Sequence, residues 1–294
     1  MSFASAAQNI VFGLFVGSIY GIAAVGLALA FGVMNVLNIA HGELLMLGGY
    51  LSYWLFSLLG LDPFVSLLIC IPALFVIGLV LDRLVYRHVA RLTGEAKLKN
   101  SLLISFGLVL ILQNLALRFF SADERTIQVA YGGAGFNLFG VALPYTRLLS
   151  LLIAVITILA LHFFLQRTYP GKAIRATAED WEAAELAGIN VQRVYMLTFA
   201  LSAALAGVAG TLVSVSASVT PSIGLEWTLK ALIVVVLAGT GSIMGAFPAG
   251  LLLGLAEALS GLFIDASYRE LVGLVIFLAV LMLRPQGLFG QQRA

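Results

Sequence analysis

Long apolar stretches separated by short polar ones dominate the pattern of this chain. A helix that spans a bilayer needs roughly 20 mainly apolar residues. The pattern predicts spans at about 9–33, 41–60, 64–82, 101–119, 147–166, 195–217 and 267–284. We therefore expect a bundle of membrane helices.

One further apolar stretch, residues 228–263, is interrupted by the sequence GTGS at 239–242 and by GAFP at 245–248. Breaks at membrane depth need shelter inside the protein. The stretch therefore forms either two short spans or a re-entrant pair. We expect one all-α transmembrane domain over residues 1–294, with about nine spans and a range of eight to ten.

The composition makes lipid the main solvent of this chain. Of its 294 residues, 61% are hydrophobic and 10% are charged, whereas about 25% of the residues of a soluble domain are charged. No Lys or Arg precedes the apolar run near Ile10, so this run is expected to be a retained helix rather than a cleaved signal. The single cysteine, Cys70, lies in an apolar run, which argues against disulfides and thiolate metal sites.

The positions of Lys and Arg predict the orientation, because cytoplasmic loops are rich in these residues. With nine spans, most of the sixteen cations fall on one side. These are Arg83, Arg87, Arg91, Lys97, Lys99, Arg167, Lys172, Arg175, Arg193, Arg284 and Arg293. Those opposite are Arg118, Arg125, Arg147, Lys230 and Arg269. We expect the N-terminus on the outside and the C-terminus in the cytoplasm.

Small residues four apart predict close helix packing. They occur at Gly17 and Gly21, at Gly250 and Gly254, and in a wider face that holds Ala203, Ala206, Gly207 and Gly210. The alternative is that helices slide at these faces while the protein works.

No soluble domain or nucleotide site fits between the spans. The longest polar stretches lie near 121–146 and 167–194. A P-loop needs a Gly-rich turn that ends in Gly-Lys-Ser/Thr, but Gly171 and Lys172 are followed by Ala173. The sequence after His41 fails the HExxH pattern, and no GxSxG or paired-aspartate signature occurs. The chain is expected to bind no ATP and to catalyse no reaction.

A short acidic amphipathic helix is predicted within the segment of about 172–190. Thr177 precedes it, acidic residues fill its early turns, where negative charge suits the helix dipole, and Gly188 ends it. Such a helix could dock into a groove on a soluble partner. The alternative is a helix on the lipid surface, which the acidic residues disfavour because an anionic leaflet repels them.

Motifs in this segment resemble a known family. Glu182-Ala183-Ala184 followed by Gly188 is similar to the start of the EAA loop of ABC importer permeases, although the later Ile-x-Leu-Pro part is missing. Further segments resemble the high-affinity branched-chain amino acid permeases, in the same order over nearly the whole chain. They are GSIYG at 17–21, FGVMNVLNIAHGE at 31–43, AGINV at 187–191, LTFAL at 197–201, LKA at 229–231 leading into GTGS at 239–242, and RPQGLFG at 284–290.

The resemblance implies a first permease that pairs with a second, different permease subunit. It also implies two cytoplasmic ATPase subunits, which bind ATP and Mg, and a periplasmic substrate-binding protein. No cofactor bound by this chain and no nucleic acid are expected. The residues that would couple to the ATPase are Glu179, Asp180, Glu182, Ala183, Ala184 and Gly188.

The substrate implied by the resemblance is a branched-chain or other neutral amino acid. The alternatives are urea, short amides or aromatic acids for a permease of the same family. An ion-coupled secondary transporter that uses Glu257 is a further alternative.

Polar residues in the predicted spans are candidates for the substrate path or a gate, because intramembrane ionisable groups are costly. Glu257 is the most deeply placed acid and would meet a substrate ammonium, or else is hydrogen-bonded for packing or kept protonated by burial. Asn35, Asn38 and His41 are spaced by three and would share a helical face, with Glu43 close behind. They are expected near the cytoplasmic ends of the first two spans, as a gate, a hinge or a helix cap.

Three further polar residues lie in predicted spans. Gln113 and Asn114 belong to the fourth span and Thr211 to the sixth. They are candidates for the path, with hydrogen bonding between helices as the alternative.

Overall fold

The computed structural model describes residues 3–89, 92, 94–138, 140–239, 241–263, 268–284 and 286–290. Its elements are α1 (Phe3–Met34), α2 (His41–Leu59), α3 (Pro63–Leu81), the π-helix η1 (Asp82–Tyr86), α4 (Arg87–Val89), α5 (Gly94–Phe120), β1 (Gly135–Leu138), β2 (Val141–Pro144), α6 (Tyr145–Arg167), α7 (Tyr169–Glu179), α8 (Trp181–Leu186), α9 (Val191–Ser216), α10 (Ile223–Ala238), α11 (Ala246–Ser260) and α12 (Arg269–Leu283). Arg91, Thr240, Pro285 and Arg293, which entered the predictions above, lie outside the described residues.

The predicted helical membrane architecture is present, but nine spans are not confirmed. Among the described residues, five helices are long and apolar enough to cross a membrane. They are Ala6–Met34, Pro63–Val89, Gly94–Phe120, Tyr145–Arg167 and Val191–Ser216. The four remaining predicted spans correspond to α2, which has 19 residues, and to the shorter helices α10 with 16 residues and α11 and α12 with 15 each.

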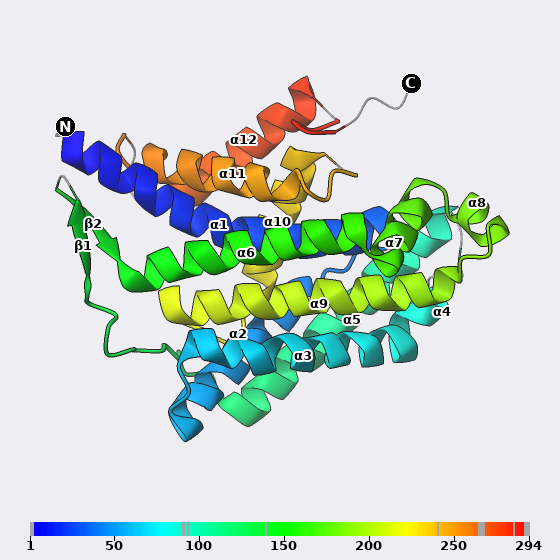
Figure 1. Cartoon of the computed structure of the whole chain (residues 1–294), viewed down its shortest axis with the longest axis horizontal. Coiled ribbons are helices and arrows are strands. Elements are labelled where there is room, and N and C mark those ends of the chain that lie inside the picture. The colour runs from blue at the N-terminus through cyan, green and yellow to red at the C-terminus, as the bar shows by residue number, and fades with distance from the viewer. Residues whose placement is uncertain are drawn as a thin grey trace.

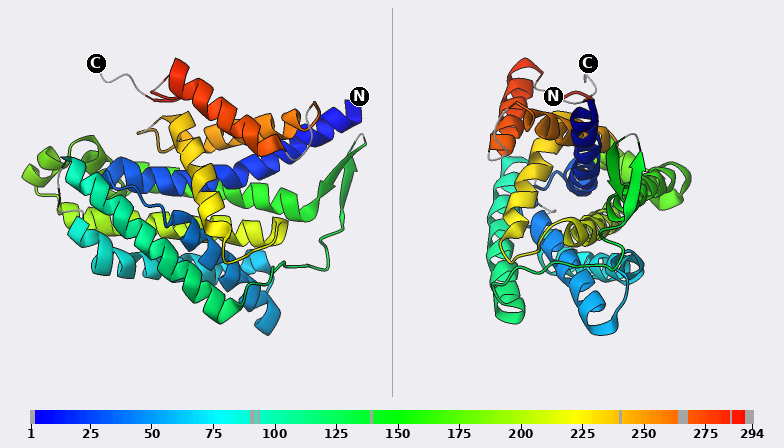
Figure 2. Two further views of the ribbon diagram at one scale, coloured as in Figure 1. Left: turned by 180° about the vertical axis from the view of Figure 1, so that it is seen from behind. Right: turned by 90° about the vertical axis from the view of Figure 1, so that its left-hand side faces the viewer.

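The interrupted stretch 228–263 forms two helices. The helix α10 ends at Ala238, and Gly239 (φ 103°) and Gly241 (φ 156°) adopt a backbone that L side chains rarely adopt. The helix α11 then begins at Ala246. The long helices α1, α6 and α9 run side by side (Figure 1), whereas α10 runs across them (Figure 2).

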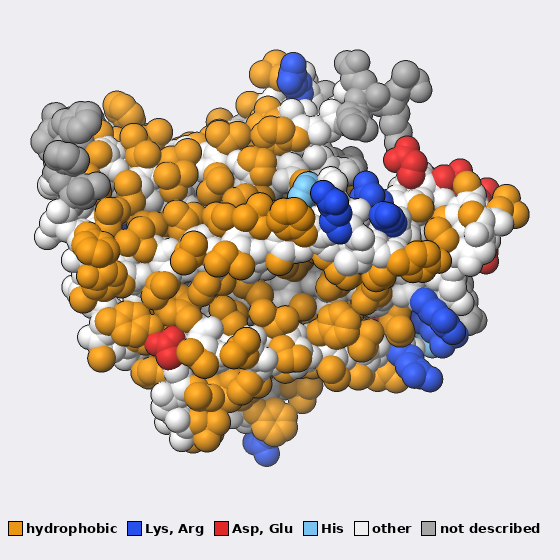
Figure 3. All heavy atoms as spheres, in the orientation of Figure 1, with side chains coloured by type: hydrophobic (Ala, Val, Ile, Leu, Met, Phe, Trp, Pro, Cys, Tyr) orange, Lys and Arg blue, Asp and Glu red, His pale blue; other side chains and the backbone are white. Residues whose placement is uncertain are grey.

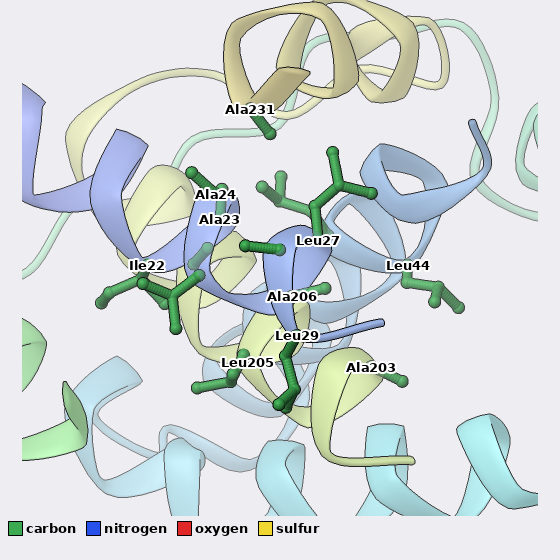
Figure 4. Close-up of a cluster of buried hydrophobic side chains, with 14 of the residues drawn as sticks. Ile22, Ala23, Ala24, Leu27, Leu29, Leu44, Ala203, Leu205, Ala206 and Ala231 are labelled. Carbon is green, nitrogen blue, oxygen red and sulfur yellow. The ribbon is translucent and has the colours of Figure 1, made fainter. Parts of the chain in front are cut away.

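The helices α1 and α9 form the centre of the bundle. In their spans 72% and 83% of the most apolar window is buried, against 22% to 28% in the spans of α3, α5 and α6. Side chains of α1, such as Leu27, meet Leu44 of α2, Ala206 of α9 and Ala231 of α10 in one cluster (Figure 4). The less buried helices therefore supply most of the surface that faces lipid.

Glycines set the closest helix contacts, as the small-residue motifs predict. The helices α1 and α11 pack antiparallel, with Gly17 and Gly21 beside Gly250 and Phe247. A Cβ placed on Gly17 would lie only 2.7 Å from the carbonyl oxygen of Gly250. Since that backbone cannot move away cheaply, this pair of helices requires glycine here.

One feature departs from the all-α prediction. The strands β1 and β2 form an antiparallel hairpin in which Gly135 pairs with Pro144. The hairpin lies at the end of the bundle that holds the start of α1, opposite α7 and α8 (Figure 1). In the segment before it, Tyr131 donates a hydrogen bond to Asp62, and burial together with this bond raises the pKa of Tyr131.

The surface reflects the membrane setting. One face is largely hydrophobic over the long helices, and most of its Lys, Arg, Asp and Glu side chains gather at the end that carries α7 and α8 (Figure 3). That distribution suits a protein whose middle meets lipid and whose charged end meets water.

Candidate substrate path and coupling segment

The break between α1 and α2 leads inward to the middle of the bundle. The helix α1 ends at Met34, and the backbone between Asn35 and the start of α2 is not helical. Asn35 is exposed and has a left-handed φ of 51°. Asn35, Asn38 and His41 therefore do not share a helical face, because the segment that holds them is not helical.

His41 starts α2 deep within the bundle. Its Nε2 lies 2.9 Å from the carbonyl oxygen of Ala23, and its Nδ1 lies 3.5 Å from the hydroxyl of Ser202. Ala23 is close to the centre of the span Ala6–Met34, and Ser202 is close to the centre of Val191–Ser216. The helix α2 thus begins near mid-depth, not at the cytoplasmic end of the bundle as expected.

Only the first part of the break is fastened at the end of the bundle. The hydroxyl of Tyr86 donates to Oδ1 of Asn38 at 2.7 Å, and the Tyr86 ring packs on Phe199 with centroids 4.4 Å apart. The N–H of Leu37 donates to the hydroxyl of Ser101 at 3.3 Å. These contacts fix Asn38 to the last residue of η1, whose ring packs on α9, and fix Leu37 to α5.

Glu43, in the first turn of α2, is a buried carboxyl group with an open hydrogen-bonding position. Glu43 is only 1% exposed. Its Oε2 has no hydrogen-bond partner among the described residues. A Cβ placed on Gly224 of α10 would overlap the Glu43 carboxyl group, so this carboxyl lies directly against the α10 backbone.

A hydrogen-bond bridge joins α2 and α10 beside Glu43. The N–H of Gly42 donates to the hydroxyl of Thr228 at 2.8 Å, and this hydroxyl donates to the carbonyl of Ile39 at 2.8 Å. A Cβ on Gly42 would overlap the carbonyl oxygen of Gly224, and a Cβ on Gly224 would overlap the Glu43 carboxyl group, so neither position has room for a side chain. The starts of α2 and α10 therefore meet near the middle of the bundle.

Glu257 is paired instead of free. Its Oε1 lies 3.0 Å from the ammonium of Lys230, and its Oε2 accepts from the hydroxyl of Tyr20 at 3.0 Å. Lys230 also lies 3.5 Å from Glu270. The cluster connects α1, α10, α11 and α12, which corresponds to the packing alternative for Glu257. Lys230, expected at the outer side, is itself buried.

The remaining path candidates are not brought together. Asn114 is exposed on α5 and donates to the carbonyl of Leu110 at 2.7 Å, while its neighbour Gln113 is half-buried. Thr211 of α9 is fully buried and donates to the carbonyl of Gly207 at 3.1 Å. The bond of Asn114 is local to its own helix, whereas Thr211 also forms a side-chain hydrogen bond with Cys70 of α3.

The predicted coupling helix is broken into two. The helix α7 reaches Glu179, and α8 begins at Trp181, so the expected single helix between Thr177 and Gly188 is wrong. Asp180 causes the break, because its carboxylate caps α8 by accepting from the N–H groups of Glu182 (2.9 Å) and Ala183 (3.0 Å).

The start of the coupling segment also differs from the prediction. Thr177 does not precede a helix but is buried inside α7. Pro170 and Gly171 lie in the first turn of α7, where Pro is well suited and where the hydroxyl of Thr168 accepts from the N–H of Gly171 at 3.1 Å.

The end of α8 is a defined motif that joins it to α9. Gly188 has a φ of 85°, its N–H donates to the carbonyl of Glu185, and the N–H of Ile189 donates to that of Ala184. Asn190 then caps α9 by accepting from the N–H of Arg193 at 3.0 Å. The helix α8 is thus tied firmly to the most buried long helix.

The tip of this segment is presented to the outside. Ala184 is buried, whereas Leu186 is 91% exposed and Trp181 is 39% exposed. Glu179 and Glu182 are also exposed. An apolar side chain flanked by carboxylates is thereby displayed at the charged end of the molecule.

Several residues of these sites were not singled out by the sequence. They are Tyr20, Tyr86 and Thr228, and also Lys230 as the ion-pair partner of Glu257. Of these, only the role of Lys230 could have been predicted from the sequence, because a cation in an apolar run needs a nearby anion. Among the described residues, no group of three His, Cys, Asp or Glu side chains could hold a metal ion.

Comparisons with known proteins agree with the resemblance. A family model described as the permease component of branched-chain amino acid transport systems matches residues 9–281. The chain is 33% identical to the high-affinity branched-chain amino acid transport system permease protein BraD of Pseudomonas aeruginosa, over 97% of this chain and 95% of the relative.

Two further relatives show the range of the similarity. The corresponding protein LivH of Escherichia coli is 31% identical, over 97% of this chain and 95% of the relative. The ribose import permease protein RbsC of Escherichia coli is 27% identical, over 90% and 82%. No solved structure matches the chain.

Proposed function

The chain belongs to the family of branched-chain amino acid transport permeases, and from this premise we propose that it carries branched-chain or other neutral amino acids into the cytoplasm. It is a permease of an ABC importer and not itself an enzyme, since ATP is hydrolysed in separate subunits of such systems. Urea, short amides and aromatic acids are the alternative substrates.

The coupling segment is the observation that carries the proposal. The helix α8 displays Leu186 beside carboxylates, and the Gly188 motif and the Asn190 cap hold it rigidly on α9. A displacement of α8 by a soluble partner is therefore transmitted to the centre of the bundle instead of being absorbed by a loop. Glu179, Asp180, Glu182, Ala183, Ala184 and Gly188 form or support this contact.

The rest of the assembly follows from the same proposal. A second permease subunit packs beside this one in the bacterial inner membrane, and two ATPase subunits that bind ATP and Mg lie beneath α8. A periplasmic binding protein delivers the substrate. The chain acts as one transmembrane domain with nine membrane-crossing helices, its N-terminus in the periplasm and its C-terminus in the cytoplasm.

The test is reconstitution of the complex in proteoliposomes with its ATPases and its binding protein. We expect Leu186→Ser to lose most ATP-driven uptake and most stimulation of ATP hydrolysis by the loaded binding protein, while the amount of complex is unchanged. Leu58→Ser is the matched control, since Leu58 is 72% exposed near the end of α2.

Two results would contradict the proposal. Full stimulation of ATP hydrolysis in Leu186→Ser would show that α8 is not the coupling element. Uptake by this chain alone, driven by an ion gradient and indifferent to ATP, would identify a secondary transporter. A binding assay of the binding protein with leucine, urea and an aromatic acid then decides the substrate class.

A further inference from the structure

Three carboxyl groups are buried among the described residues: Glu43, Asp82 and Glu257. Lys230 neutralises Glu257 at 3.0 Å. Asp82 lies in η1 near the end of the bundle, and its Oδ1 also has no hydrogen-bond partner among the described residues. Glu43 and Asp82 form no ion pair within the described part of the chain, but only Glu43 lies beside the mid-depth residue His41, two positions after it.

The surroundings of Glu43 offer groups for both ends of a zwitterion. The helices α2 and α10 both begin beside it, and the residues before them, Ala40 and Ser222, provide no side-chain cap. In the closed state the Thr228 hydroxyl occupies the Gly42 N–H in the first turn of α2. A helix N-terminus carries a partial positive charge that attracts an anion. The unpartnered Oε2 of Glu43 attracts a cation. One carboxylate beside two helix starts suits a substrate that has an ammonium and a carboxylate close together.

Burial makes this site prefer a substrate that carries an ammonium group. A carboxyl group held away from water without a partner is costly, and an ammonium that docks against it removes that cost. An analogue without a positive charge does not remove this cost. Glu257 offers no such gain, because Lys230 and Tyr20 already occupy both of its oxygens.

The structure shows the site closed. Gly224 lies against the Glu43 carboxyl group, and Gly42 contacts the same turn of α10. The Thr228 hydroxyl holds the two helices together through the Gly42 N–H at 2.8 Å. Access to Glu43 therefore requires α10 to separate from the start of α2, and the two glycines allow that contact to close completely.

We infer that Glu43 receives the ammonium group of the amino acid substrate when α10 separates from α2. This inference rests on the proposed function and names the residue that would make the contact. The starts of α2 and α10 receive the carboxylate of the same molecule. The side chain of the substrate meets the apolar residues around them.

The experiment uses proteoliposomes that contain the whole importer and measures the initial uptake of radiolabelled leucine from its binding protein. We expect Glu43→Gln to lower uptake about tenfold or more, as for loss of a charge-assisted hydrogen bond. Glu43→Asp keeps the charge and is expected to retain a substantial part of the uptake. The amount of assembled complex should be unchanged in both.

Thermal stability separates a binding role from a structural one. Glu257→Gln, the matched buried carboxyl group, breaks an ion pair and is expected to lower the melting temperature of the complex. Glu43→Gln removes an unpaired carboxyl group and is expected to leave the melting temperature unchanged or to raise it.

The inference is overturned if Glu43→Gln takes up leucine within twofold of the wild type. It is also overturned if Glu43→Gln and Glu43→Asp lose uptake equally, or if Glu43→Gln lowers the melting temperature as Glu257→Gln does. The proposed function has its own readout, because it fails when the wild-type complex shows no ATP-driven uptake of neutral amino acids.

Discussion

Replacement of Lys230 by Met tests the electrostatic cluster that joins four helices. Lys230 and Glu257 are 3.0 Å apart, and their side chains are only 10% and 9% exposed. At that separation two unit charges attract by about 5 kcal/mol at an effective dielectric constant near 20. Desolvation offsets much of this attraction, but Lys230→Met leaves the Glu257 carboxylate buried with Tyr20 as its remaining partner. We expect a loss of roughly 3–5 kcal/mol in the free energy of unfolding.

Replacement of the partner residue, Glu257→Gln, is expected to lower the free energy of unfolding by less than Lys230→Met does. In Glu257→Gln the amide still accepts from Tyr20, and the Lys230 ammonium keeps Glu270, which lies 3.5 Å away with a side chain that is 66% exposed. The double variant has neither buried charge. Its loss should therefore be smaller than the sum of the two single losses, by at least about 1.5 kcal/mol.

The assay is a titration of the purified protein in mild detergent with a denaturing detergent, followed by tryptophan fluorescence. Trp227 is a suitable reporter, because its ring packs edge-on against Tyr20 with centroids 5.6 Å apart. If the single losses add within about 0.5 kcal/mol in the double variant, the two charges do not interact and the reasoning is refuted.

The remaining predictions concern glycines. Gly17→Leu should prevent α1 from packing on α11 and lower the yield of folded protein, measured by gel filtration with fluorescence detection, whereas Gly107→Leu should be tolerated because nothing lies within 4 Å of a Cβ there. Gly188→Ala should destabilise the end of α8 by about 1 kcal/mol through its φ of 85°, since no atom obstructs a Cβ, and should weaken the stimulation of ATP hydrolysis by the loaded binding protein. Gly188→Asn should be milder, because Asn tolerates the left-handed region; equal effects of Ala and Asn would contradict this account.

Much of the coupling segment was predictable, because its signals are local. Gly188 ends α8 through contacts within five residues, and Asn190 starts α9 through a bond to Arg193. The break at Asp180 was missed because the same residue suits both the interior of an acidic first turn and an N-cap. The short bonds of its carboxylate to Glu182 and Ala183 decided for the cap.

The sequence by itself determined that this is a helical membrane protein whose small-residue faces pack closely. Length and hydropathy suffice for the first conclusion, and the spacing of Gly17, Gly21, Gly250 and Gly254 suffices for the second. Only the tertiary structure decided that α2 starts near mid-depth, that Glu257 meets Lys230 and Tyr20, and that Glu43 has no such partner among the residues that the structure describes. The physical reason is that lipid is as apolar as the protein core, so the sequence pattern does not reveal which helix face is buried. A polar side chain in such a helix then depends on partners far away along the chain, as Glu257 depends on Tyr20.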